Sequence, residues 1–410
     1  MFFPDNTTVI DAFFSDHSIP GHSDKKRFCV TDHGVAENSA EIQTAALQKV
    51  IDLAAEQGGG VVVIPAGKFF SGSLFFRPGC HLYLEEGAVL TGSDDISDFA
   101  LIRDHRMEGE NVCYFSALIN AENCDNFTIS GKGMLDGNGL RYWRSFWLRL
   151  KFNPKCTNMD EMRPRLLFVA NSNNVCISGI KIHNSPFWST HFYRCQKLRL
   201  LDLDIFAPSE PVPAPSSDAV DLDVCSDVLI RSCRMEVNDD AVALKGGKGP
   251  LAHTLPENGS NERIIIENCD FVNCHSALTC GSETVRNRNV IMRDCRIDRT
   301  PVFYLKMRPD TLQKSEYIAV SRITGNTRLF FHANSWTQFK RCEELLISCG
   351  ENISFCDVDL DCRKICDAPD SKEFFLRNIL WKNCTLRSEA PFECGPENLK
   401  SITLENVSMP

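Results

Sequence analysis

The sequence predicts an all-β chain that folds as a parallel β-helix, with one helix capping its N-terminal end. From Phe127 onward the template apolar-x-apolar-x-x-apolar-x-apolar recurs roughly every 23 to 36 residues, a spacing typical of stacked repeats. The alternation predicts strands, and the two-residue step in the middle predicts a bend at which the inward-facing parity changes. An amphipathic segment ahead of this array suits a cap over its open end.

The template is followed most closely by a set of copies that continues to the C-terminal residues. These copies are Val175/Ile177/Ile180/Ile182, Leu198/Leu200/Leu203/Ile205, Val228/Ile230/Cys233/Met235, Ile264/Ile266/Cys269/Phe271, Val290/Met292/Cys295/Ile297, Ile353/Phe355/Val358/Leu360, Ile379/Trp381/Cys384/Leu386 and Ile402/Leu404/Val407/Met409. Phe127/Ile129/Met134 is a degenerate copy that lacks the third apolar residue, and Ile318/Val320/Ile323 is a further candidate.

The third apolar position distinguishes a β-helix from the sandwich or propeller that short, regularly spaced strands can also build. Down the copies this position reads Ile, Leu, Cys, Cys, Cys, Val, Cys, Val, which indicates an internal ladder of like residues. The repeating unit is also one bent strand pair rather than a four-stranded blade. We therefore predict that Cys233, Cys269, Cys295 and Cys384 are free, buried core residues and not metal or redox ligands.

We expect a single β-helix domain over residues 1–410. Residues 30–75 are assigned to the N-terminal cap and the lead-in to the helix, and residues 76–410 to the coils. Three insertions, at 138–165, 206–217 and 246–262, separate some copies and are expected on the surface, where they often wall a binding face.

The cap is predicted from a helix with clear ends. Asn38 or Ser39 is expected to N-cap a helix that begins near Ala40, because side-chain oxygens there accept the first free N–H groups. A run of three glycines at 58–60 ends the helix, and the apolar stretch 61–64 is a buried strand.

Composition limits the partners and the compartment. The net charge of −10 argues against a nucleic-acid partner, and no apolar run approaches the roughly 18 residues that cross a bilayer, so we expect no membrane partner. The first residues lack the basic start of a signal peptide. With 20 cysteines and no CxxC pair, we predict a reducing, cytoplasmic setting; a secreted protein whose leader had been removed would look the same. The oligomeric state is left open.

Three tryptophans lie in or near these insertions. Trp143 and Trp147 belong to the first insertion, and Trp188 precedes the central coils. Each of them suits either stacking on a sugar ring or partly buried packing, and the sequence alone favours neither.

Acidic residues cluster in the central copies, between residues 216 and 245. Asp218, Asp221 and Asp223 come before one apolar repeat, and Asp239 and Asp240 come after it. Crowded carboxylates raise each other's pKa, so such clusters are candidate functional sites.

The repeat register predicts which of these residues meet. The copy at Val228 advances 36 residues to the copy at Ile264, so Asp239 should lie next to His275 on the adjacent coil. Asp218 and Asp240 should be neighbours about 4.8 Å apart, one strand spacing. The side chains expected to point outward form two rows: Asp221, Ala243, Thr279 and Tyr304 in one, and Asp223, Lys245, Gly281 and Lys306 in the other.

This arrangement suits glycoside hydrolysis with inversion. Such an enzyme needs one protonated carboxyl group for the leaving oxygen and one carboxylate that activates a water molecule. The two carboxyl groups lie about 6.5–9.5 Å apart, which leaves room for that water. Asp218 and Asp240 would hold the water together, and Asp239 would be the acid. The alternative is that these residues are turn aspartates and solvated charges at strand ends, which we keep open above all for Asp221, Asp223 and Asp227.

The same residues resemble the ordered motifs of glycoside hydrolase family 28, the polygalacturonase-like pectin hydrolases. The family's Asn-Thr-Asp-x-x-Asp, Asp-Asp, Gly-His-Gly and Arg-x-Lys correspond to residues 216–221, 239–240, 274–276 and 304–306. The resemblance covers most of the chain and implies a right-handed, pectin-lyase-like β-helix and an inverting mechanism without a cofactor or metal.

Residue roles follow from the resemblance. Asp239 is the expected general acid, Asp218 and Asp240 position the water, and His275 supports the acid. By the same resemblance, Lys306 binds the carboxylate of a pectic, uronate-containing substrate. From the outward rows we expect Tyr304, Asp221 and Lys245 to bind the substrate as well. We expect an exo-acting, galacturonosidase- or polygalacturonase-like hydrolase.

Departures from the motifs keep alternatives open. Two serines replace Asn-Thr, Cys274 and Ser276 replace the glycines, and Tyr304 replaces the arginine that grips a uronate. A rhamnogalacturonan-type hydrolase is one alternative. Another is a lyase with Ca²⁺ on Asp218, Asp221 and Asp240 and with Lys245 or Lys306 as base. The third is a non-catalytic sugar-binding β-helix.

Overall fold

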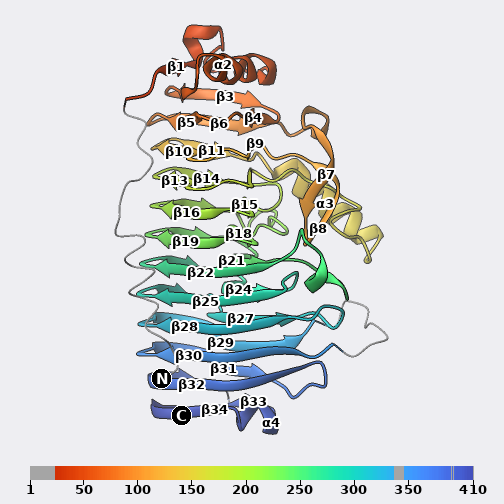
Figure 1. Ribbon diagram of the computed structural model, residues 1–410, viewed down its shortest axis with the longest axis vertical. Helices are drawn as coiled ribbons and strands as arrows, with labels where there is room; N and C mark the ends of the chain where they lie inside the picture. The colour runs from red at the N-terminus through yellow and green to blue at the C-terminus, as the bar shows by residue number, and fades with distance from the viewer. Residues whose placement is uncertain (1–23, 337–345, 389, 391, 410) are drawn as a thin grey trace.

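A computed structural model describes residues 24–336, 346–388, 390 and 392–409, and in it the chain forms a tall stack of parallel coils (Figure 1). A total of 32 strands belong to one continuous parallel sheet that winds around the core. The predicted parallel β-helix is therefore confirmed.

The coils have three faces, each a ladder of parallel strands. The first face contains β1 (Arg27–Cys29), β2 (Gly60–Ile64), β5 (Cys80–Leu84), β10 (Thr128–Gly131), β13 (Cys176–Ser178), β16 (Gln196–Leu201), β19 (Ser226–Arg231), β22 (Ser260–Glu267), β25 (Arg286–Arg293), β28 (Lys314–Ser321), β30 (Ser348–Cys356), β32 (Phe374–Ser388) and β34 (Ile402–Ser408). The second contains β3 (Gly67–Ser71), β6 (Ala88–Gly92), β11 (Met134–Asp136), β14 (Lys181–His183), β17 (Asp204–Phe206), β20 (Arg234–Glu236), β23 (Asp270–Val272), β26 (Arg296–Asp298) and the first parts of β29 (Thr324–Ser335) and β31 (Asp359–Ala368). The third contains β4 (Leu74–Phe76), β9 (Ile119–Glu122), β12 (Leu167–Ala170), β15 (Thr190–Tyr193), β18 (Val220–Asp223), β21 (Asp240–Lys245), β24 (Ser276–Gly281), β27 (Phe303–Met307), the later parts of β29 and β31, and β33 (Glu393–Cys394).

The bend inside each repeat has a local cause. Asp202, Ser232, Asn268 and Asp294 all occupy the left-handed region, with φ between 53 and 56°, at the step between the second and third apolar positions. Short polar side chains tolerate this conformation better than most others. The left-handed residue at this step turns the chain and changes which parity faces inward, which explains the two-residue step in the sequence.

The cysteine ladder is present as predicted. Cys233, Cys269, Cys295 and Cys384 are free and buried in the main core. The first three occupy the third apolar position of successive coils, and Ile323 and Val358 fill that position before Cys384. The degenerate copy differs from the prediction, because Leu135 and not Met134 is the buried residue that pairs with Ile182.

The N-terminal cap forms, but its helix begins later than predicted. The helix α2 (Thr44–Glu56) packs Leu47, Val50, Ile51 and Ala54 over the first coil. Neither predicted cap residue caps it: the side chain of Asn38 accepts the backbone N–H of Lys68 at 2.9 Å, and that of Ser39 accepts the N–H of Glu41 at 3.1 Å. These bonds form a loop and a local turn that delay the helix.

The coils also begin earlier than residue 76. The strands β2, β3 and β4 pair in parallel with β5, β6 and β9, so the first complete coil starts at Gly60. The predicted strand at 61–64 lies within β2 and is confirmed.

Several elements lie outside the repeat. They are the antiparallel hairpin of β7 (Leu101–Met107) and β8 (Glu110–Phe115), the helices α3 (Leu140–Phe152) and α4 (Pro396–Leu399), and the short helices η1 (Val30–His33), η2 (Ile96–Asp98) and η3 (Ala252–Thr254). The hairpin and α3 lie along one side of the stack (Figure 1).

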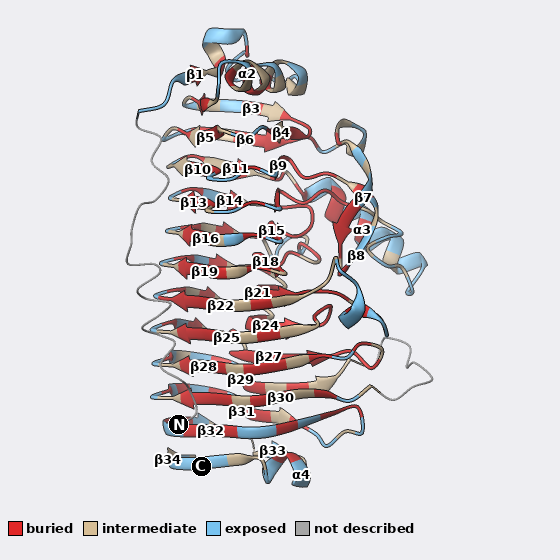
Figure 2. Ribbon diagram, viewed as in Figure 1, coloured by how far each residue is buried: buried red, intermediate tan, exposed pale blue. Residues whose placement is uncertain are grey.

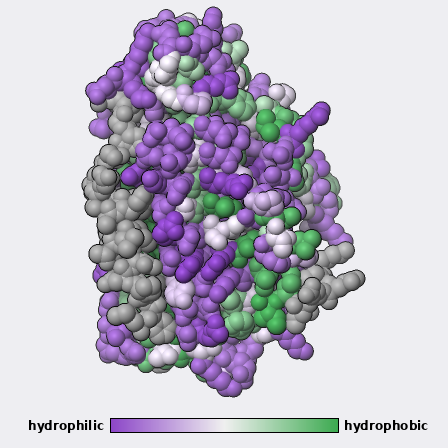
Figure 3. All heavy atoms as spheres, in the orientation of Figure 1, coloured by the Kyte–Doolittle hydropathy of each residue, from purple (hydrophilic) through white to green (hydrophobic). Residues whose placement is uncertain are grey.

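Burial follows the coil geometry. Buried residues run through the strands of the coils up to β32, whereas β34, α3 and the turns carry many exposed residues (Figure 2). Hydrophilic side chains cover much of the face shown in Figure 3, with smaller hydrophobic areas between them. Within the described ranges, no helix is long and apolar enough to cross a membrane.

Candidate active site

Asp218 and Asp240 are neighbours on adjacent coils, as the repeat register predicts. β18 pairs with β21 with Val220 opposite Val242, and the backbone N–H of Ala219 donates to the carbonyl oxygen of Asp240 at 3.0 Å. Both carboxylates therefore stand where their strands begin, on the third face of the helix.

Asp239 and His275 are neighbours in the same way. β21 pairs with β24 with Asp240 opposite Ser276, and the backbone N–H of His275 donates to the carbonyl oxygen of Asp239 at 2.9 Å. We call Asp218, Asp239, Asp240 and His275 the acidic edge.

The predicted rows beyond the acidic edge are also confirmed. β24 pairs with β27 with Thr279 opposite Tyr304 and Gly281 opposite Lys306. The inward-facing residues of these strands all lie in the main core: Val242, Leu244, Leu278, Cys280, Phe303 and Leu305.

Asp240 is buried between the ring of His275 and the ammonium of Lys306. The Nδ1 atom of His275 lies 2.9 Å from its Oδ1, and the Nζ atom of Lys306 lies 3.5 Å from its Oδ2. Burial by itself would raise the pKa of Asp240, but Lys306 and His275 together hold that pKa well below its ordinary range. Asp240 is therefore a firm anion.

His275 differs from its predicted role. Its ring bonds the carboxylate of Asp240, whereas support for Asp239 was expected. Burial opposes the charged imidazole, but the bond to Asp240 outweighs it and raises the pKa of His275. The reason for the difference is that Asp239 meets His275 through its backbone carbonyl, while Asp240, one residue later, directs its carboxylate to the ring.

Asp239 provides the accessible part of the edge. Its Oδ1 accepts the backbone N–H of Asp240 at 3.0 Å, and its side chain is partly exposed. The neighbouring His275 side chain is 42% exposed. Ser217, which replaces a motif threonine, holds this strand start by accepting the N–H of Asn238 at 3.0 Å. A substrate can thus reach Asp239 and His275 directly.

Lys245 lies behind the edge in a buried group of acids. Its Nζ is 3.7 Å from Asp218 Oδ2, 3.6 Å from Asp221 Oδ1 and 3.4 Å from Glu283 Oε2. We call these four residues the Lys245 cluster. Within the described part of the chain, neither oxygen of Asp221 has a hydrogen-bond partner.

Burial raises the pKa values of two of the three acids in this cluster. It raises the pKa of Asp218 well above the ordinary value, with further increases from the charges of Asp239 and Asp221 and opposition from Lys245. Burial likewise raises the pKa of Asp221, against the effect of Lys245. Glu283 differs, because Lys245 and Arg308 outweigh its burial and lower its pKa to about 2.

Two residues expected to bind substrate are thus not at the surface. Asp221 is 0% and Lys245 5% exposed. They point outward from the coil, as predicted, but a hairpin and a buried tryptophan cover that row. The repeat pattern specifies the direction of a side chain and carries no information about what an insertion lays over it.

Tyr304 is also covered, contrary to the expectation that it faces the substrate. It is 3% exposed, its ring stacks on His332 at 4.1 Å between centroids, and its hydroxyl donates to Asn334 at 2.8 Å. The Lys306 ammonium lies 4.5 Å from the ring centre of Trp336, so aromatic side chains hold the cation beside Asp240.

The hairpin β7–β8 is anchored through Asp223. Arg106 donates from Nε and Nη2 to the two oxygens of Asp223 at 2.8 and 3.0 Å, and from Nη1 to Asn258 at 2.9 Å. Arg106 and Asp223 are both buried, and Arg106 lowers the pKa of Asp223 to about 2 against the effect of burial. Asp223 is therefore a structural ion-pair partner and not a solvated charge.

The hairpin crosses the third face beside the acidic edge. His105 packs edge-on against Phe168 of β12 with centroids 4.6 Å apart, and Met107 packs with Trp188 ahead of β15. At the turn, a side chain on Gly109 would come within about 3.0 Å of Glu283, which shows how closely the tip approaches the Lys245 cluster. The rows of β12, β15 and β18 are covered by this crossing.

The three tryptophans are mainly packing residues. Trp143 and Trp188 are buried, and the ring centre of Trp188 lies 4.9 Å from the Lys245 ammonium. Trp147 is 37% exposed but donates its indole N–H to the carbonyl oxygen of Pro213 at 2.7 Å. No sugar-stacking platform is formed by Trp143 or Trp188.

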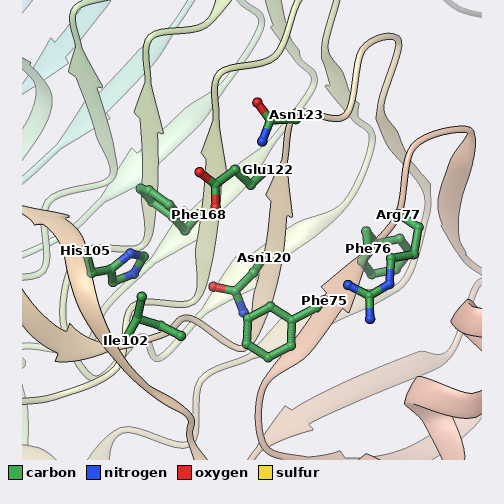
Figure 4. Close-up of a pocket in the computed structure, with 9 residues that line it drawn as sticks. All are labelled: Phe75, Phe76, Arg77, Ile102, His105, Asn120, Glu122, Asn123 and Phe168. Carbon is green, nitrogen blue, oxygen red and sulfur yellow. The ribbon is translucent and has the colours of Figure 1, made fainter. Parts of the chain in front are cut away.

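A hollow of about 250 Å³ lies where the hairpin leaves the stack (Figure 4). Its lining residues are Phe75, Phe76, Arg77, Ile102, His105, Asn120, Glu122, Asn123 and Phe168. The amide of Asn120 is fully used by the backbone of Leu74 and Ala117, and no pair of catalytic groups faces the hollow. We interpret it as a packing gap.

The acidic edge brings together three atoms that suit a cation. One oxygen each of Asp239 and Asp240 and a ring nitrogen of His275 lie within 4.8 Å of one another. The Lys306 ammonium, 3.5 Å from Asp240, already supplies positive charge at that point. The calcium site of the lyase alternative does not assemble, because Asp218 and Asp221 face Lys245.

Sequence reasoning missed the residues that hold this site from behind. Arg106, Glu283, Arg308 and Trp336 all lie outside the template positions, so the repeat gives no signal for them. The hairpin alone had a readable signal, since Glu108-Gly109 separates two stretches of strand-forming residues.

The chain is similar in sequence to known proteins. The profile of the family described as "Glycosyl hydrolases family 28" matches residues 89–303, more than half of the chain. A probable polygalacturonase from Vitis vinifera is 27% identical over 266 residues, which cover 62% of this chain and 51% of that protein. An exopolygalacturonase from Zea mays is 22% identical over 367 residues, covering 89% and 77%. The chain thus spans about half the length of the grape relative.

Solved structures share the fold. An exopolygalacturonase from Thermotoga maritima superposes with a TM-score of 0.77 at 20% identity, covering 98% of this chain and 96% of that one. A polygalacturonase from Erwinia carotovora ssp. carotovora gives a TM-score of 0.69 at 18% identity, covering 94% and 93%. At these identities the likeness establishes the architecture only.

Proposed function

Because this chain belongs to glycosyl hydrolase family 28, we propose that it is an inverting hydrolase that removes units from one end of a pectic, uronate-containing saccharide. The observation that carries the proposal is the acidic edge, where Asp218, Asp239 and Asp240 converge beside His275 at the starts of two adjacent strands. The polygalacturonase names of its relatives support the substrate class.

Each residue of the edge has a proposed part. Asp240, held anionic by His275 and Lys306, accepts a proton from the attacking water, and Asp218 orients that water from the next coil. Asp239, the accessible carboxyl, delivers a proton to the leaving oxygen. Proton donation and water activation from opposite sides of the bond produce inversion.

Lys306 is the cation we propose for a substrate carboxylate. Its side chain is 11% exposed, and its ammonium lies between Asp240 and the Trp336 ring. A uronate bound there would share this charge with Asp240. Lys245, which is enclosed by acids and Trp188, takes no part in that contact.

The hairpin supports action at a chain end. It covers the third face on the N-terminal side of the acidic edge and is pinned there by the buried Arg106–Asp223 pair. On the C-terminal side, Asn334 and Trp336 keep partly exposed side chains. Among the described residues, the cover thus lies mainly on one side of Asp239, which is the asymmetry we expect of an exo-acting enzyme.

Tyr304 favours a second candidate, a hydrolase of rhamnogalacturonan-type linkages. It occupies the position of the motif arginine, and its only polar atom is committed to Asn334. Tyr304 itself offers no guanidinium for a bidentate grip on a second uronate. A neutral sugar on one side of the cleaved bond would not need that grip.

We also propose that the protein works in a reducing compartment such as the cytoplasm. The support is chemical: four ladder cysteines are free and buried, and no disulfide occurs in the described part of the chain.

One experiment tests the proposed function. Defined oligogalacturonides and rhamnogalacturonan oligosaccharides are incubated with the protein, and the first products are followed by proton NMR and by chromatography. We expect single terminal units of inverted configuration, with no loss of activity in EDTA. Retained configuration, internal cleavage products, or an unsaturated product that requires Ca²⁺ would contradict the proposal.

A further inference from the structure

Lys245 has an unusual environment for a lysine on the outward row of a strand. Its ammonium touches three carboxylates at 3.4 to 3.7 Å and the face of Trp188, and the residue is 5% exposed. A substrate carboxylate has no open path to it. The charge of Lys245 therefore acts inside the protein.

Asp218 depends on this charge. Among the described residues, Lys245 is the one cation within 4.0 Å of the Asp218 carboxylate. Asp221, the second acid of the cluster, makes no hydrogen bond that would hold it independently. The position of Asp218 is thus set by an ammonium that two other acids share.

Glu283 is the third carboxylate that contacts the Lys245 ammonium, and other residues hold it in place. Its Oε1 accepts a hydrogen bond from Ser282 at 2.6 Å and lies 3.5 Å from Nη1 of Arg308. Arg308 is itself held by two contacts of 2.8 Å to Asp310. Glu283 is therefore firmly placed, and it shares the Lys245 ammonium with Asp218.

From this geometry we infer that Lys245 is a positioning residue, which fixes the carboxylate of Asp218 toward the attacking water and takes no part in binding substrate. The inference rests on the proposed function of the acidic edge and adds a residue to it. It also replaces the substrate contact that the sequence pattern suggests for Lys245.

The first test separates positioning from binding. In Lys245→Met we expect kcat to fall by roughly 10-fold or more while KM stays within about twofold, the pattern of a group that acts on the transition state alone. Lys248→Met is the matched control, because Lys248 pairs with Glu110 at 2.9 Å near the hairpin tip and does not touch Asp218. A raised KM with kcat retained would show that Lys245 binds substrate and would overturn the inference.

The pH profile gives a signature that a purely structural role would not produce. Without Lys245, the acids around Asp218 act unopposed, so the pKa of Asp218 rises and the acid limb of kcat/KM moves to higher pH. In Glu283→Gln one carboxylate fewer shares the Lys245 ammonium. We therefore expect the pKa of Asp218 to fall and the acid limb of kcat/KM to move to lower pH by a smaller amount. The charged groups that face Asp218 are Asp221, Asp239, Asp240, Lys245 and the more distant Lys306.

A measurement without turnover tests the effect of Lys245 on Asp218 separately from the proposed function. Carboxyl carbon NMR of protein labelled at aspartate, assigned with Asp218→Asn, reports the titration of Asp218 in the wild type and in Glu283→Gln, which retains Lys245. Opposite shifts in Lys245→Met and Glu283→Gln support the inference; an Asp218 resonance indifferent to both overturns it. If Lys245→Met does not fold, the Glu283→Gln titration decides alone. Absence of hydrolysis by the wild type would refute the proposed function only.

Discussion

Asp221 and Asp223 stand two residues apart on one strand, both fully buried, yet their surroundings differ in kind. Asp223 receives two short hydrogen bonds from Arg106, and its pKa falls to about 2. Asp221 has a single ammonium at 3.6 Å, shared with two other acids, and its pKa rises well above the ordinary range. Burial is the same for both residues, so the hydrogen bonds from charged partners decide whether a buried carboxylate stabilises the fold or keeps a raised pKa.

The two environments have different purposes. The Arg106–Asp223 pair joins the hairpin to the stack with a full set of hydrogen bonds, as a structural contact requires. The Lys245 cluster leaves Asp221 without a hydrogen bond next to the acidic edge. Buried carboxylates with strongly shifted pKa values are typical of functional sites.

The largest expected effect is on the structural side of this comparison. Arg106→Met leaves the buried Asp223 without its partner, so we expect the free energy of unfolding to fall by about 3–5 kcal/mol. Urea titration measures it. Arg77→Met is the matched control, because its pair with Asp52 is about half exposed and should contribute less than about 1 kcal/mol. Equal losses in the two variants would show that the buried pair has no special weight.

The next effect is on the functional side. Asp239→Asn removes the proposed acid, and we expect kcat to fall by about 100-fold or more, equivalent to about 2.7 kcal/mol, with the fold unchanged. Steady-state kinetics and circular dichroism measure both. Asp270→Asn, an exposed aspartate paired with Arg296 on the second face, is the control. Turnover near the wild-type level in folded Asp239→Asn would exclude this residue from the mechanism.

The smallest effect distinguishes the two aspartates directly by pH. Because the folded pKa of Asp223 lies below its unfolded value near ~3.9, its contribution to stability is present above that value and lost as the pH falls toward 2. Asp223→Asn should therefore reduce the slope of unfolding free energy against pH in this window by up to about 1.4 kcal/mol per unit.

Asp221 should behave in the opposite way. Its pKa is raised in the folded state, so the fold loses stability as the pH rises above the unfolded pKa. Asp221→Asn should therefore raise stability at neutral pH. It should leave unchanged the slope of unfolding free energy against pH in the acid window below ~3.9. Chemical denaturation from pH 2 to 7 compares the two variants. The same acid slope in both would mean that their environments do not differ in the way the contacts indicate.

The coils and the meeting of the acidic-edge residues could be predicted from the residue pattern. A parallel ladder repeats its register once per coil, so counting residues placed Asp239 beside His275 and Asp218 beside Asp240. The same counting placed the four ladder cysteines in the core. These are consequences of backbone hydrogen bonding, which depends on spacing alone.

The cover over the acidic edge, and the side chains that shift its pKa values, depend on contacts between an insertion and the coils. Arg106 reaches Asp223 from 117 residues earlier in the chain, on a hairpin outside the repeat. That contact, with Trp188 and Glu283, turns Lys245 and Asp221 from expected surface residues into buried ones. Side-chain contacts between an insertion and a coil have no periodicity, and pKa values depend on distances of a few ångströms, so neither could be read from the pattern of residues.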